Sequence, residues 1–124
     1  MIFALALLQS VAPSPPPAAD PDIVVIARKL QDWRASVRMK KGKYVCAVTR
    51  STGDPEIDGV ACEAMRVCAI PAMPRYTATR AKGVDAATRQ RLIEAINGEM
   101  ATCVRDQRHQ LIGELADRRA GAVQ

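Results

Sequence analysis

The stretch WRASVRMKKGKYVCAVTR, residues 33–50, decides how this chain folds. Apolar and polar side chains alternate along both halves of the stretch, and Lys41-Gly42 separates the two halves. Alternation with a period of two on either side of a glycine turn is typical of a β-hairpin. We therefore expect a hairpin over about 33–50 with one face directed to the core. The face expected to be buried carries Trp33, Val37, Cys46 and Val48.

Two helices are expected after the hairpin. Asp54 and Pro55 suit the N-cap and the first position of a helix over about 55–69, because an N-cap carboxylate accepts hydrogen bonds from the free N–H groups of the first turn. A longer helix is expected over about 85–119, where apolar residues recur every three or four positions. Asn97-Gly98 is a point where this second helix can kink or divide, because both residues favour helices weakly.

The residues before the hairpin give a candidate third strand. Ile23–Ile26 is a β-branched run, which predicts a short strand over 23–27, and a helix that runs on through Leu30 is the alternative. This order of elements indicates an α+β fold, in which helices cover one face of a small antiparallel sheet. Residues 12–22 are rich in Pro and Ala and are expected to form an extended linker. We expect a single globular domain over 23–120.

The N-terminus resembles an export signal. Ile2–Leu8 is an apolar run of the length found in signal peptides, and it is too short to span a bilayer. Small residues follow it, so we expect a signal peptide over about 1–19 with the cleavage site left open. The mature protein is therefore expected in the periplasm or outside the cell, and it is not expected to be a transmembrane protein.

Four cysteines lie beyond this signal, namely Cys46, Cys62, Cys68 and Cys103. The closest two have five residues between them, whereas zinc sites and thioredoxin-like redox pairs use C-x-x-C. Disulfides are common in small exported domains that have a thin hydrophobic core. We therefore expect two structural disulfides, and neither a bound metal nor another cofactor.

The expected helix over 55–69 limits how these cysteines pair. Cys62 and Cys68 would lie about 9 Å apart along its axis, which exceeds the Cα separation of roughly 4.4–6.8 Å in disulfides. Cys46 and Cys62 lie at matching distances from the loop that joins the hairpin to the helix. We therefore favour the pairs Cys46–Cys62 and Cys68–Cys103. The alternative is Cys46–Cys68 together with Cys62–Cys103.

The basic residues are concentrated on and just before the hairpin. The chain has a formal net charge of +5, and residues 28–50 hold eight basic residues and one acidic residue. A concentrated basic face attracts anions, and the anions outside the cytoplasm include anionic lipid, lipopolysaccharide and acidic envelope polymers. We therefore expect a non-enzymatic exported protein that binds such components through five residues of the hairpin. These residues are Arg34, Arg38, Lys40, Lys41 and Lys43.

The same charges have a simpler interpretation, because lysines on an exposed strand protect the edge of a sheet from aggregation. Nucleic acid is not an expected partner, since binding of single strands uses exposed aromatic rings. Only Trp33, Tyr44 and Tyr76 follow the expected signal, and the core needs these rings.

A catalytic function has one candidate residue. His109 is the only histidine, and Asp106 precedes it by three positions on the same helical face. A carboxylate can orient a histidine that acts as a base, so a small periplasmic hydrolase or an inhibitor-like protein is the alternative function. Residues 54–59 resemble the start of a calcium loop, but Met65 occupies the position at which calcium binding needs an acid.

The sequence resembles two groups of known proteins. Residues 22–27, DIVVIA, are similar to the energy-coupling box of TonB-dependent outer-membrane receptors, and that resemblance implies strand pairing with the TonB protein. A chain of this length has no room for a receptor barrel, so we expect these residues to form a strand of the protein's own sheet. The signal, the same I-V-V segment, the STGDPEID loop and the cysteine layout together resemble small exported four-cysteine proteins of alphaproteobacteria. That second resemblance implies no activity.

Overall fold

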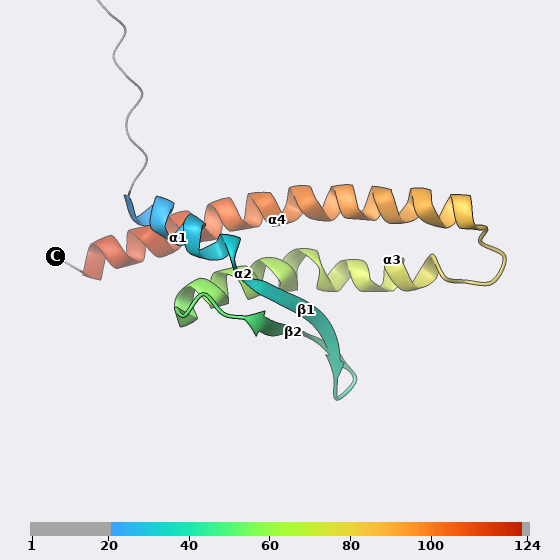
Figure 1. Ribbon diagram of the computed structural model, residues 1–124, viewed down its shortest axis with the longest axis horizontal. Coiled ribbons are helices and arrows are strands. Elements are labelled where there is room, and N and C mark those ends of the chain that lie inside the picture. The colour runs from blue at the N-terminus through green and yellow to red at the C-terminus, as the bar shows by residue number, and fades with distance from the viewer. Residues whose placement is uncertain (1–20, 123–124) are drawn as a thin grey trace, which may run out of the picture.

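The structure, a computed structural model, describes residues 21–122. The expected signal peptide, 1–19, and most of the expected linker lie outside these residues. Figure 1 shows a long helix with a row of shorter helices beside it, and a hairpin that projects from this row. The α+β fold is confirmed. Its elements are α1 (Pro21–Gln31), β1 (Arg34–Lys40), β2 (Lys43–Arg50), α2 (Pro55–Cys68), the 3₁₀ turn η1 (Ile70–Ala72), α3 (Met73–Ala78) and α4 (Ala86–Ala122).

β1 and β2 form the expected hairpin, which is a two-stranded antiparallel sheet. Val37 pairs with Cys46 and Met39 pairs with Tyr44, so the alternating residues share one face as the sequence predicts. The turn is made by Lys41 and Gly42, whose φ angles are 50° and 77°. Two consecutive positive φ angles are typical of type I′ turns, which match the twist of the strands that they join.

The buried part of this hairpin face is smaller than expected. Trp33 is 6% exposed, whereas Val48 is 41% exposed although the sequence places it on the core face. Met39, near the turn on the same face, is 57% exposed. The expectation for Val48 is wrong because the helices cover only part of this face and leave Val48 exposed, although it pairs with Ala35 near the base. Met39 is exposed because the turn end of the hairpin projects beyond the helices (Figure 1).

Residues 23–27 are helical, so the expected third strand is wrong. α1 buries Ile26 and Leu30, which lie one turn apart, and Trp33 follows them into the same core cluster. This spacing is that of an amphipathic helix, and burial of the three side chains outweighs the preference of a β-branched run for strands. α1 begins at Pro21, so the last two residues of the expected linker are also helical.

The second expected helix forms as α4 and is not divided. It continues through Asn97-Gly98, the pair at which the sequence allows a kink or a division. Ile96 just before this pair is buried, and Cys103 just after it is bonded to α2. Tertiary contacts on both sides of the pair therefore outweigh its low helix propensity.

The core lies at one end of the helical body, where α1, α2 and the last part of α4 meet. Its buried residues are Ile26, Leu30, Trp33, Ile57, Val60, Ala61, Leu115 and Ala116. Beyond this cluster the helices bury mainly small side chains, at Ala64, Cys68, Ala69 and Ala72, together with Ile96. The hairpin therefore begins at the large-residue core, because Trp33 immediately precedes β1.

Candidate anion-binding hairpin

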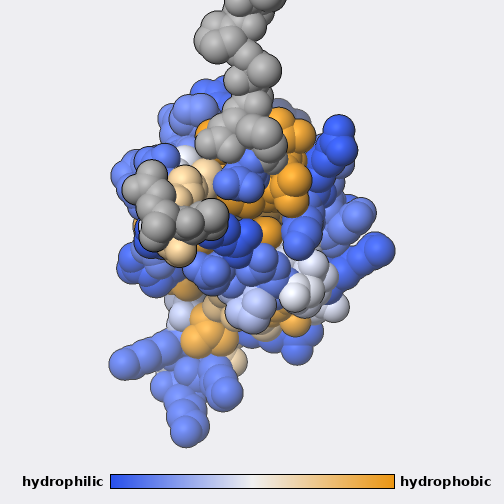
Figure 2. Space-filling view, turned by 90° about the vertical axis from the view of Figure 1, so that its left-hand side faces the viewer, coloured by the Kyte–Doolittle hydropathy of each residue, from blue (hydrophilic) through white to orange (hydrophobic). Residues whose placement is uncertain are grey.

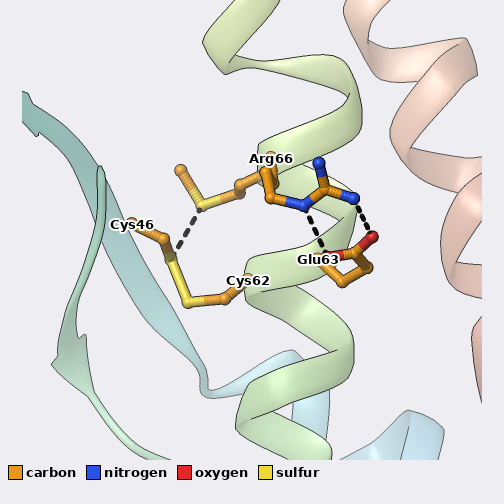
Figure 3. Close-up of a disulfide and its surroundings, with 5 residues drawn as sticks. Cys46, Cys62, Glu63 and Arg66 are labelled. Atoms are coloured by element: carbon orange, nitrogen blue, oxygen red, sulfur yellow. Dashed lines mark hydrogen bonds and ion pairs between the residues drawn. A yellow bond between two sulfur atoms is a disulfide. The ribbon is translucent and has the colours of Figure 1, made fainter. Parts of the chain in front are cut away.

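A disulfide fixes the hairpin to the helical body. Cys46 of β2 is bonded to Cys62 of α2 with a Cα–Cα distance of 5.7 Å, and Figure 3 shows the bond crossing from the strand to the helix. The Sδ atom of Met65 lies 3.8 Å from the Sγ atom of Cys46. Glu63 and Arg66 of α2 form an exposed ion pair close to this bond (Figure 3). The middle of the hairpin is thus held on α2 by a covalent bond and a sulfur contact.

The second disulfide joins the two long helices. Cys68, the last residue of α2, is bonded to Cys103 of α4, also with a Cα–Cα distance of 5.7 Å. Both favoured pairs, Cys46–Cys62 and Cys68–Cys103, are therefore confirmed. The hairpin, α2 and α4 are linked in series by covalent bonds, and disulfides of this kind are typical of proteins from oxidising compartments.

The turn of the hairpin carries exposed lysines. Lys40 and Lys43 face each other across the ladder, and Lys41 lies in the turn between them. All three are exposed, and no carboxylate in the described part of the chain forms an ion pair with any of them. Like charges directly opposite each other in a ladder are unfavourable. An anion bound at the turn would relieve this repulsion.

The arginines of the predicted set have different surroundings. Arg34 Nη1 donates to the backbone oxygens of Gln31 at 2.9 Å and Trp33 at 2.8 Å, so this guanidinium caps the end of α1. Arg38 is exposed, and its Nε donates to Ser36 Oγ at 3.3 Å. The structure therefore separates Arg34, at the base of the hairpin, from four residues nearer the turn. We call these four the tip cations: Arg38, Lys40, Lys41 and Lys43.

Apolar atoms accompany the tip cations. Met39 is 57% exposed and pairs with the half-buried Tyr44 on the face opposite to Arg38 and Lys40. Figure 2 shows hydrophilic side chains that extend from the lowest part of the molecule, where the hairpin projects, with an apolar patch close to them. Cationic side chains around a few apolar ones suit the boundary between lipid headgroups and acyl chains.

The carboxylates of the calcium-like segment bind groups of the chain itself. Asp54 accepts hydrogen bonds from the backbone N–H of Glu56 and from Arg119, the latter at 2.7 Å. Asp58 accepts from Ser51 Oγ at 2.5 Å and from Thr52 Oγ1 at 2.7 Å. The hydrogen bond from Arg119 lowers the pKa of Asp54, and that from Ser51 lowers the pKa of Asp58. Within residues 21–122, no three His, Cys, Asp or Glu side chains are grouped as metal ligands would be.

His109, the candidate catalytic residue, lies on the exposed side of α4. It borders an open hollow whose walls are formed by α4 alone. Asp106 contacts Arg105, with Nε 3.4 Å from Oδ1, and no hydrogen bond joins Asp106 to His109 among the described contacts. The walls carry no hydroxyl or thiol that a histidine base could activate. They consist of Met100, Ala101, Val104, Arg105, Arg108, His109 and Ile112.

Sequence reasoning missed one contact at the base of the hairpin. The guanidinium of Arg108 lies over the indole ring of Trp33, 5.7 Å from its centroid. The available signal was the position of Arg108 between Val104 and Ile112, one turn away in each direction on the same face of α4. A basic residue on an apolar stripe of a helix indicates a cation that is partly covered.

Comparisons of the chain with protein families, with characterised proteins and with solved structures find no match. Among the helices described, none has the length and apolar character needed to cross a membrane.

Proposed function

We propose that the protein is a non-enzymatic module, exported to the periplasm or secreted, whose hairpin docks on anionic components of the cell envelope. The observation that carries the proposal is the position of the tip cations. They lie at the end of a hairpin that is braced by a disulfide, and the three lysines have no carboxylate partner among the described residues. Phospholipid headgroups and lipopolysaccharide both present the phosphate groups that such a tip would bind.

The expected affinity comes from the number of cations. A Lys or Arg close to an anionic membrane surface contributes about 1 kcal/mol, so four of them suffice for reversible docking. Exposed charges are screened over about 10 Å at 0.1 M salt, and the binding should therefore weaken steeply as the salt concentration rises. Met39 adds a small apolar contribution that salt does not remove.

The test is sedimentation of the protein with vesicles of phosphatidylglycerol, with phosphatidylcholine vesicles as the reference. The tip variant carries Arg38→Gln, Lys40→Gln, Lys41→Asn and Lys43→Gln, and asparagine is chosen because it tolerates the positive φ angle of residue 41. We expect the wild type to bind phosphatidylglycerol at low salt and the tip variant to bind at least a hundredfold more weakly.

A matched control separates a local effect from one of net charge. Four exposed cations away from the hairpin are changed to glutamine, so that the net charge falls by the same amount. They are Arg80, Lys82, Arg91 and Arg118. We expect this control variant to retain most of the binding. Equal loss in the two variants, or no binding of the wild type to phosphatidylglycerol at low salt, would contradict the proposal and leave edge protection as the role of the hairpin charges.

A further inference from the structure

Arg108 of α4 is a half-covered cation. Its guanidinium stacks over Trp33, and no carboxylate of residues 21–122 forms an ion pair with it. Desolvation by its surroundings lowers the pKa of this arginine, although arginine remains charged in proteins. A partly desolvated charge is unfavourable until an opposite charge or an acceptor approaches it.

Two buried donors in this contact have no acceptor among the described residues. The Nε atom of Arg108 and the Nε1 atom of Trp33 are both buried and make no hydrogen bond within the described part of the protein. Trp33 is itself only 6% exposed. Buried N–H groups almost always find a partner. Two such donors on side chains in direct contact therefore indicate that the Arg108–Trp33 contact is a place where an acceptor atom would bind.

The hollow beside Arg108 has a basic half and an apolar half. It is a shallow hollow that is open to solvent along α4, and the residues that line it all belong to that helix. Arg105, Arg108 and His109 form the basic half and Met100, Ala101 and Val104 form most of the apolar part, while Ile112 lies on the far side of the basic residues. Between residues 100 and 108 the helix rises about 12 Å, so a ligand lying along this face would place its two ends on different halves.

We propose that this hollow binds a single-chain amphiphile with an acidic head, of the fatty-acid class. The carboxylate would accept hydrogen bonds from Arg108, with Arg105 and His109 beside it, and the alkyl chain would lie over Val104, Ala101 and Met100. A carboxylate matches a guanidinium in charge and in geometry, and the apolar half removes the chain from water. This site lies on α4 and is separate from the tip cations.

The test is a calorimetric titration of the full protein with dodecanoate below its micelle concentration. Trp33 is the only tryptophan, so its fluorescence gives a second readout from a ring that touches Arg108. We expect saturable binding with one ligand per protein and a change in Trp33 fluorescence. Arg108→Gln should weaken binding about tenfold or more, because a hydrogen bond to a charged group is lost.

Two comparison ligands test the two halves of the hollow, one ligand for each half. Dodecyltrimethylammonium has the same chain with a cationic head, and acetate has the head without the chain; we expect neither to compete with dodecanoate at equal concentration. A second protein variant, Ala101→Glu, places a carboxylate on the exposed apolar half and should also weaken binding, without depending on the fold near Trp33.

The tip variant of the hairpin should bind dodecanoate as the wild type does, which keeps this site distinct from the proposed envelope docking. Absence of saturable binding would overturn the inference. Unchanged affinity in both Arg108→Gln and Ala101→Glu would do the same, as would equal binding of the cationic amphiphile.

Discussion

The two ends of the hairpin have opposite surroundings. At the base, Trp33 is buried in the core, and the neighbouring middle of the hairpin is held by the bond from Cys46 to α2. At the turn, Met39 is 57% exposed and the lysines contact no described carboxylate. Both ends belong to one continuous ladder of paired residues. The difference indicates that the base stabilises the fold and that the tip is free to contact another molecule.

This comparison separates residues that determine stability from residues that determine binding. A small chain with few large rings gains little from its core alone, so the contacts at the base should matter for folding. Substitutions at the tip should leave folding almost unchanged, because they remove no buried contact. Each of the following predictions would break the comparison if it failed.

The largest expected effect is in the core that receives the base of the hairpin. Leu115 of α4 is fully buried in the cluster that contains Trp33, so Leu115→Ala should reduce the free energy of unfolding by about 4 kcal/mol. The matched change at the tip, Met39→Ala, should cost less than about 0.5 kcal/mol. Urea unfolding followed by circular dichroism measures both, and similar losses at the two sites would contradict the comparison.

The next effect concerns the disulfide at the middle of the hairpin. Replacing Cys46 and Cys62 together by alanine opens a bridge with a sequence separation of 16, and the chain-entropy account gives about 3 kcal/mol for a loop of that size. The bridge Cys68–Cys103 spans a separation of 35, so its removal should cost about 4 kcal/mol on the same account. Denaturant unfolding of the two double variants measures the loss of unfolding free energy for each bridge. A larger loss for Cys46–Cys62 than for Cys68–Cys103 would contradict this order.

A smaller effect is expected at Asp54, just after the hairpin. Asp54→Ala removes an N-cap of α2 and should cost about 1 kcal/mol at neutral pH. The hydrogen bond from Arg119 holds the pKa of Asp54 below its ordinary value of about 3.9. The ionised carboxylate therefore contributes its full stabilisation above about pH 3.9. This contribution is lost as the pH falls through the lower pKa that Asp54 has in the folded state.

Unfolding measured from neutral pH down to about pH 2 tests this sign. The stability difference between wild type and Asp54→Ala should shrink as the pH falls. A difference that grows on acidification would show that the charged form of Asp54 does not stabilise the fold.

The smallest effect on stability is expected for the tip variant. Its four substitutions remove no buried group, and they relieve the repulsion between Lys40 and Lys43. Its midpoint of thermal unfolding should match that of the wild type within a few degrees. A marked loss of stability would show that these cations serve the fold, and the vesicle result for this variant could no longer be assigned to binding.

The parts of the fold that the sequence predicts are those governed by local geometry. The alternation around Lys41-Gly42 sets the hairpin register, and the rise of a helix excludes a bond between Cys62 and Cys68. α1 was predicted wrongly because the β-branched run at 23–26 fits a strand and a helix, and only packing against α2 and α4 decides between them. The helical turns at 70–78 are set by packing in the same way.

The residues of the candidate site also differ in whether the sequence predicts them. The tip cations are predictable because charge density in a hairpin is a property of the sequence, and the turn places them at an exposed end. The capping role of Arg34 was not predictable, since it depends on how α1 ends against β1. The contact of Arg108 with Trp33 also escaped prediction, because it joins residues that are distant in the chain and meet only in the packed fold.

The central claim, that the tip contacts an anionic surface while the base holds the fold, is tested most directly by hydrogen–deuterium exchange with and without phosphatidylglycerol vesicles at low salt. We predict slower exchange in peptides that cover residues 38–44 and unchanged exchange in those that cover α2, residues 55–68. Slower exchange confined to the helices, with no change at 38–44, would contradict the account.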